Sequence, residues 1–150
     1  MKNIRNQKPQ RGGFTLVEVM IVLFILVMIG GFAVVAVQGQ RATAQKRTAL
    51  AYTKMLATQI KSFDGIAGRL PTTAEGLTAL VVRPADLSEA NWGGPYLESF
   101  AVSRDPWGNE YQYISPGKDG RPFDIWSFGP DGMDGTDDDI GHWMTINDLK

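Results

Sequence analysis

The feature that most constrains this chain is a run of 24 residues, Phe14–Val37, whose only charged side chain is Glu18. As an α-helix with a rise of about 1.5 Å per residue, the run extends over roughly 36 Å. The hydrocarbon core of a bilayer is about 30 Å thick, so a helix of this length crosses it with some tilt. Residues 1–13 carry four basic side chains and no acidic one, which predicts that they stay cytoplasmic while residues 38–150 lie across the membrane.

A cleaved secretory signal begins with the same order of basic and apolar residues. Its apolar region, however, is only about 7–15 residues long and ends at a small-x-small cleavage site. The nearest approach to such a site here is Gly30-Gly31-Phe32-Ala33, which does not close the run cleanly. We therefore predict a membrane helix that is retained in the mature protein.

Glu18 is the exception within this run, because a carboxylate at the bilayer centre costs about 2.5–3.5 kcal/mol on insertion scales. One interpretation places it near the cytoplasmic interface, where its side chain reaches the headgroups. The other interpretation requires a cation, which the run lacks. Cleavage between Gly13 and Phe14 would create an α-amino group four residues before Glu18, on the same face of the helix. Such an amine–carboxylate pair would hold neighbouring helices in register.

The composition excludes several classes of function. The chain has no cysteine, which excludes disulfides, thiolate metal sites and cysteine nucleophiles, and it has one histidine, His142. A net charge of −1 gives no basis for binding nucleic acid. Ser127, His142 and nearby aspartates are the residue types of a catalytic triad, but nothing in the sequence marks a nucleophile elbow. We expect no catalytic activity.

The rest of the chain predicts an α+β fold. Apolar residues recur at steps of three and four beyond the run, which indicates an amphipathic helix that ends before Pro71; they are Tyr52, Met55, Leu56, Ile60 and Phe63. Thr72 and Glu75 form a capping box that opens a short helix through Val81. Residues 83–98 are predicted to be a loop, and residues 110–114 and 123–128 two strands of a small antiparallel sheet packed on the long helix. The four tryptophans are predicted to be core residues.

Five aspartates lie within nine residues near the carboxyl end: Asp131, Asp134, Asp137, Asp138 and Asp139. Carboxylates this close repel one another unless they are solvated or bind a cation. Hard oxygen ligands on a flexible loop suit calcium, although the spacing is not that of an EF-hand, since His142 stands at the twelfth position. The residues alone leave a solvated acidic loop and a calcium site both open.

The stretch Gly13-Phe14-Thr15-Leu16-Val17-Glu18 resembles the type III signal of type IV pilins and type II secretion pseudopilins. The resemblance implies that a prepilin peptidase cuts between Gly13 and Phe14 and methylates the new amino terminus. It also implies that Glu18 is the glutamate that acts in assembly.

Segments 69–77, 105–108, 124–132 and 138–143 resemble the major pseudopilins of type II secretion, general secretion pathway protein G. Type IV pilins usually close with a cysteine-bounded loop, which this chain lacks. The resemblance implies a type IV pilin-like fold with three parts. These are a cleaved cytoplasmic leader, 1–13, a transmembrane and assembly helix, 14–37, and a periplasmic domain, 38–150, that ends in a calcium loop.

The resemblance also implies one Ca²⁺ in the acidic loop. Asp131, Asp138 and Asp139 would supply side-chain oxygens, and Phe128 and Thr136 backbone carbonyls, with Asp134 and Asp137 as extra acids. The implied function is that of the major subunit of a periplasmic pseudopilus, a helical homopolymer. It would assemble from the inner membrane with minor pseudopilins, an assembly platform and its ATPase, and would help to export folded proteins through the outer membrane. Two alternatives stay open: a type IV pilin for adhesion or motility, and a membrane-anchored calcium-binding domain that does not assemble.

Overall fold

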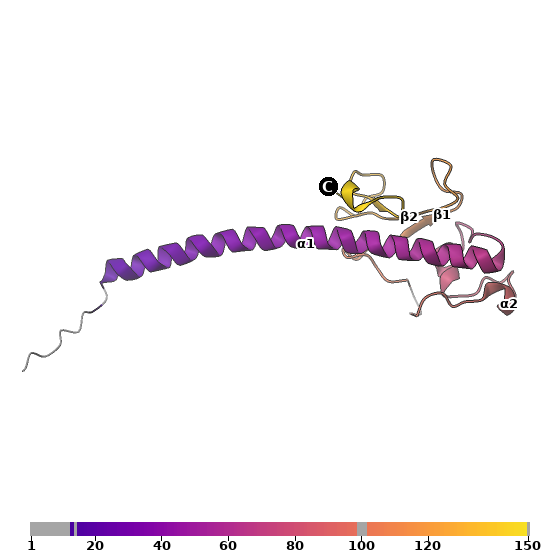
Figure 1. Ribbon diagram of the computed structural model, residues 1–150, viewed down its shortest axis with the longest axis horizontal. Helices are drawn as coiled ribbons and strands as arrows, with labels where there is room; N and C mark the ends of the chain where they lie inside the picture. The colour runs from indigo at the N-terminus through magenta and orange to yellow at the C-terminus, as the bar shows by residue number, and fades with distance from the viewer. Residues whose placement is uncertain (1–12, 14, 99–101, 150) are drawn as a thin grey trace, which may run out of the picture. The chain divides into compact units, whose positions relative to one another are not determined.

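The computed structural model describes residues 13, 15–98 and 102–149, and for residues 30–39 it describes the backbone alone. The chain divides into two compact units, Met1–Gln40 and Arg41–Lys150. Helix α1, Leu16–Ala67, is 52 residues long and contributes to both units (Figure 1). Its first turn receives a side-chain cap, since the Glu18 amide donates to Thr15 Oγ1 at 3.3 Å. It ends at Gly68, whose φ of +70° is the left-handed conformation common after helices, so the predicted end before Pro71 is confirmed.

The second half of α1 supplies the centre of the core. Leu56, Ile60 and Phe63 are fully buried, and Tyr52 and Met55 pack beside them, which confirms the predicted amphipathic face. These side chains cluster with apolar residues from η1, α2, β1 and β2 and the loops between them, among them Leu80, Trp92, Tyr113 and Ile125. The helix is therefore the element around which the other segments pack.

A three-stranded antiparallel sheet packs in this core, in the order β1 (Gln112–Ile114), β2 (Asp124–Ser127), β3 (Ile140–Gly141). Tyr113 pairs with Ile125, and Ser127 pairs with Ile140. The α+β prediction and its two strands are confirmed, although both strands are shorter than predicted. β3 was not predicted, because a two-residue strand is too short to show an alternating pattern.

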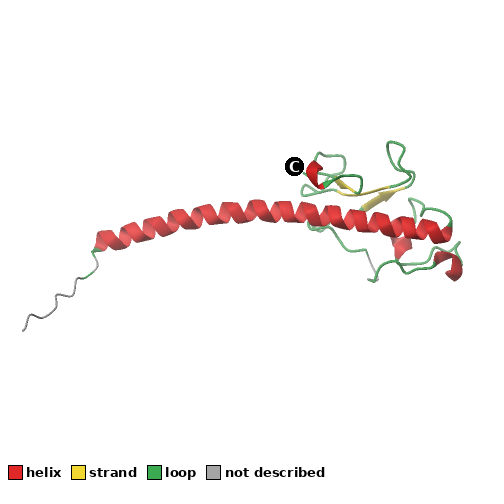
Figure 2. Cartoon of the chain, in the orientation of Figure 1, coloured by secondary structure: helices red, strands yellow, loops and turns green. Residues whose placement is uncertain are grey.

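Short helices interrupt the long loops between these elements (Figure 2). Thr72 and Glu75 exchange the predicted capping-box bonds, but these bonds close a turn before the helix. The helix that follows is a 3₁₀ helix, η1 (Gly76–Leu80), whose N-cap, Glu75, makes no side-chain cap bond to it. The prediction that residues 83–98 are only a loop is wrong. They contain α2 (Glu89–Trp92), which Ser88 caps, and a further 3₁₀ helix, η2 (Ile146–Asp148), lies near the carboxyl end.

The tryptophan prediction holds for two of the four residues. Trp92 and Trp126 are each 8% exposed, and Trp92 Nε1 donates to the Ala79 carbonyl at 2.9 Å. Trp107 is half-buried beside the second, smaller apolar cluster around Leu50 and Ile140. The prediction is wrong for Trp143, which is 42% exposed because its ring lies against the Arg121 guanidinium, 4.4 Å away, instead of entering the core.

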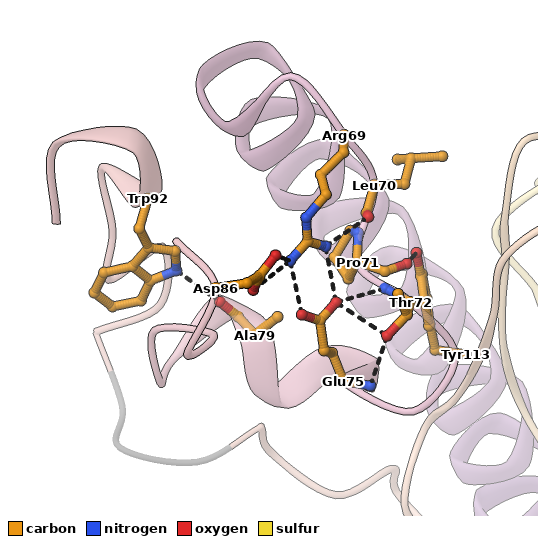
Figure 3. Close-up of polar contacts among 9 residues, drawn as sticks. All are labelled: Arg69, Leu70, Pro71, Thr72, Glu75, Ala79, Asp86, Trp92 and Tyr113. Atoms are coloured by element: carbon orange, nitrogen blue, oxygen red, sulfur yellow. Dashed lines mark hydrogen bonds and ion pairs between the residues drawn. The ribbon is translucent and has the colours of Figure 1, made fainter. Parts of the chain in front are cut away.

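An ion-pair cluster around Arg69 ties the end of α1 to the loops that follow it (Figure 3). The guanidinium donates to both oxygens of Glu75, at 2.7 and 2.8 Å, and to both oxygens of Asp86, at 2.8 and 2.9 Å. Glu75 also accepts from the Thr72 amide at 2.7 Å. The hydrogen bond from Arg69, supplemented by those from Thr72, lowers the pKa of Glu75 from 4.5 to about 2.

This cluster predicts an acid-sensitive stability. A carboxyl whose folded pKa lies below its ordinary value stabilises the fold above the ordinary value and loses that contribution as the pH falls toward the folded pKa. We expect Glu75→Gln to lower the free energy of unfolding by about 1–3 kcal/mol at pH 7, and the difference from wild type to shrink as the pH falls from 4.5 toward 2. Urea unfolding of the full chain in detergent measures this difference. Glu110→Gln, at an ion-paired side chain that is 75% exposed, is the matched control. A loss of unfolding free energy in Glu75→Gln that does not change with pH would contradict the prediction.

Candidate functional site

The predicted processing and assembly residues lie at the start of α1. Gly13 is exposed, and a Cβ at that position would meet no atom within 4 Å. Phe14 lies outside the described residues. Glu18 is exposed in the first turn of the helix. The structure thus places Glu18 at the helix start, and the cleavage predicted between Gly13 and Phe14 stays a prediction.

The helix that follows Glu18 presents apolar side chains that nothing in the described chain covers. Every large apolar residue from Leu16 to Ile29 is 46–78% exposed. Burying one such side chain is worth about 1.5–3 kcal/mol, so together they provide a strong driving force for burial against another surface. Among the described residues, no helix meets the length and hydropathy needed to cross a membrane. The predicted membrane run also includes Phe14 and residues 30–37, and the structure does not describe Phe14 or the side chains of residues 30–37.

The acidic loop is folded by bonds to its own carboxylates. Asp138 Oδ1 accepts from Thr136 Oγ1 at 2.5 Å, and Asp138 Oδ2 accepts from the Asp131 amide at 3.3 Å. Asp139 Oδ2 accepts from the Gly135 amide at 2.8 Å, and the Thr136 carbonyl accepts from the Asp139 amide at 3.3 Å. Four of the five predicted calcium ligands are therefore joined by hydrogen bonds within one loop.

The fifth predicted ligand, Phe128, directly follows β2, and Gly129 comes next. A Cβ at Gly129 would lie 2.3 Å from the Asp138 carbonyl oxygen, and Gly129 has a φ of +71°, so this position requires glycine. The close approach brings the end of β2 against the acidic loop. The predicted ligands on the two sides of Gly129 are in this way held near one another.

One oxygen in the loop fits a cation. Asp139 Oδ1 is buried, and no hydrogen-bond partner for it exists within the described residues. Burial raises the pKa of Asp139, and the charges of Asp134, Asp138 and Asp131 add to the effect, against the bond from Gly135. A buried carboxylate oxygen surrounded by other carboxylates suits a hard cation such as calcium. Over the part of the chain that is described, however, no group of three or more histidine, aspartate or glutamate side chains is arranged to hold a metal ion.

Trp126 joins the acidic loop to the 115–122 turn, and Trp143, beyond the loop, packs on the same turn; the sequence did not predict these contacts. Trp126 Nε1 donates to Asp134 Oδ1 at 2.9 Å, and the Lys118 ammonium lies 5.6 Å from the centre of the same indole. Arg121, which pairs with Asp124 at 2.5 Å, covers Trp143. These contacts join residues from different segments of the chain, so no short sequence pattern predicts them.

The triad residue types do not form a catalytic triad in the described structure. Ser127 Oγ donates to Asp105 Oδ2 at 2.6 Å, while Asp105 Oδ1 accepts from two backbone amides of the following turn. His142 Nδ1 accepts from the Ile125 amide at 3.2 Å, beside the β2–β3 pairing. Ser127 and His142 therefore serve the packing of separate backbone segments.

An amino-terminal helix with exposed apolar turns, continued by a half that packs on a small antiparallel sheet, defines a type IV pilin-like protein. The family described as type II secretion system protein G matches residues 36–143, and the prokaryotic N-terminal methylation motif matches residues 8–34. The chain belongs to the type II secretion system protein G family.

Individual relatives agree with this assignment. Type II secretion system core protein G of Dickeya chrysanthemi is 40% identical over 144 residues, covering 94% of this chain and 91% of the relative. The protein of the same name from Vibrio cholerae is 37% identical, with both chains covered fully. The crystal structure of the major pseudopilin from the type 2 secretion system of enterohaemorrhagic Escherichia coli matches with a TM-score of 0.58 and 33% identity, covering 71% of this chain and 92% of that one.

Proposed function

We propose that this protein is the major structural subunit of a type II secretion pseudopilus, which polymerises in the periplasm and helps to export folded proteins through the outer membrane. The family, the relatives and the fold support this function, and neither alternative function gains support from them. The observation that carries the proposal is the exposed apolar surface of Leu16–Ile29 joined to a well-packed domain. Such a chain has to bury its helix in a membrane or against copies of itself.

The proposed cycle begins in the inner membrane. The leader, residues 1–13, lies in the cytoplasm, residues 14–37 span the bilayer, and residues 38–150 form the periplasmic domain. A prepilin peptidase removes the leader and methylates Phe14. An inner-membrane platform and its ATPase then add subunits to a fibre that also contains minor pseudopilins. The protein has no catalytic role of its own and is a substrate of the peptidase.

Assembly depends on two kinds of contact in this proposal. The apolar side chains of the first half of α1 bury against those of neighbouring copies, which replaces lipid with protein. The α-amino group of Phe14 pairs with the Glu18 carboxylate of a neighbouring copy and removes the cost of an unpaired charge in an apolar core. The apolar contact keeps the helices away from water through close packing, and the charge pair fixes the axial position.

Calcium binding is the second part of the proposal. Asp131, Asp138 and Asp139 would hold a Ca²⁺ ion through side-chain oxygens, with the Phe128 and Thr136 carbonyls. The orphaned Asp139 Oδ1 supports this assignment. The ion would cross-link a loop that has no disulfide. At a hundredfold excess over its dissociation constant it would stabilise the fold by about 2.7 kcal/mol.

The assembly proposal predicts the effect of removing the Glu18 carboxylate. Glu18→Ala makes the helix more apolar, so the chain should insert into the membrane as well as wild type. Fibre formation should be lost, because the amine of Phe14 then has no partner. Sedimentation of sheared fibres and immunoblotting of membranes measure the two properties. Val19→Ala, a truncation in the same turn, is the matched control and should assemble. If the protein were an anchored domain that does not assemble, Glu18→Ala would change neither the membrane level nor the fibre yield.

The calcium proposal predicts that Ca²⁺ raises the melting temperature of wild type relative to chelator. Asp138→Ala should abolish this rise, because a ligand is lost. Asp137→Ala, which removes an exposed neighbouring carboxylate outside the ligand set, should keep it. Thermal unfolding in calcium and in chelator measures the rise. Equal melting temperatures of wild type in the two conditions would exclude the site.

A further inference from the structure

A face of α1 turned away from the core carries a regular series of exposed residues. They are spaced by three and four: Ala44, Arg47, Ala51, Lys54, Thr58, Lys61 and Gly65. Residues seven apart lie nearly in line on a helix, so the side chains of Arg47, Lys54 and Lys61 form one row about 21 Å long. We call these three residues the basic row. No acidic residue occurs between Arg41 and Phe63, and the first one on the helix after the row is Asp64.

The basic row has no ion-pair partner within the described residues. The cations of the ion pairs found there are Arg69, Arg104 and Arg121. Asp148 accepts hydrogen bonds from Thr145, and these bonds, with a smaller contribution from the charge of Lys54, lower its pKa. It forms no ion pair with Lys54 among the described contacts. Three exposed cations therefore lie in line on this helix, and none of them forms an ion pair within the described residues.

The acidic loop is the complementary surface of the same domain. It holds five carboxylates and no basic residue between Asp131 and Asp139, and Asp131, Asp134 and Asp137 are exposed. No hydrogen bond or ion pair involves the Asp137 side chain among the described residues. Asp137 is also outside the proposed calcium ligands, and it lines a pocket together with Lys46 of the same chain.

We propose that the basic row of one copy docks against the acidic loop of a second copy in the assembled fibre. Both surfaces belong to every copy and are opposite in charge, so one head-to-tail contact can repeat along a helical polymer. The inference rests on the proposed function, because it joins assembled copies. Burial of the apolar helices is not directional. A row of three charges against a compact acidic loop sets the rotation and spacing of neighbouring domains.

Charge reversal in the full chain, expressed with its secretion system, tests this contact. Replacement of all three residues of the basic row by glutamate should reduce the yield of sedimenting fibres about tenfold at normal membrane levels. Asp137→Lys should also reduce it, and adding Asp137→Lys to the row variant should recover part of the yield, because opposite charges face each other again. Glu98→Lys, an exposed reversal outside both surfaces, is the matched control. Normal fibre yield from the row variant would overturn the proposal.

Disulfide formation tests the contact directly, because the natural chain has no cysteine. Cysteine is placed at position 47, 54 or 61 in one copy and at position 137 in a second copy that carries a mass tag. A disulfide joining the two copies needs Cα atoms within about 7 Å, so at least one pair should give a cross-linked heterodimer in fibres. The cross-link should disappear when both copies carry Glu18→Ala, which prevents assembly. Fibres in which none of the three pairs cross-links would contradict the docking.

These outcomes separate the inference from the proposed function. If fibres form with the same yield after charge reversal and none of the cysteine pairs cross-links, the inference fails and the pseudopilus function stands. If the wild-type chain forms no fibres and the cysteine pairs form no cross-link, both fail. If the row variant assembles normally but loses binding to vesicles of anionic phospholipid, the row contacts lipid and the docking to a second copy is wrong.

Discussion

The rest of the structure depends on where α1 buries its apolar side chains. In its second half the helix has a core of its own, with Leu56, Ile60 and Phe63 fully enclosed by later segments. From Leu16 to Ile29 the apolar side chains have no cover within the described chain. The domain is held by its own core and the first half of the helix has none, so the free energy of burying that half is available only from a bilayer or from other copies.

Polar contacts determine how the segments, and in our proposal the copies, are oriented when the apolar surface is buried. Around Arg69 one cation pairs with two carboxylates of the same chain, and these pairs fix the end of α1 to the turn before η1 and to the loop after it. Glu18 and the basic row differ, because no ion pair satisfies them in the described residues. The fold therefore satisfies the charges that shape the domain and leaves exposed those that we assign to contacts between copies.

Sequence patterns predicted the parts of this account that are local. Period and length were enough for α1, the capping box at Thr72 and Glu75, and the two main strands, while a short signal around Gly13 and Glu18 indicated the family. The patterns missed β3 and the bond from Trp126 to Asp134, because both depend on segments brought together only by folding. They misplaced Trp143, since stacking on Arg121 competes with burial and the sequence does not show which contact prevails.

The measurement that tests the central claim most directly is electron cryo-microscopy of fibres sheared from cells that express the natural chain. The account predicts a fibre core built from the first half of α1, beginning at Phe14, with the Phe14 amine beside Glu18 of a neighbouring copy and the sheet-bearing domains outside. Fibres whose helices face solvent, or whose subunits retain residues 1–13, would contradict it.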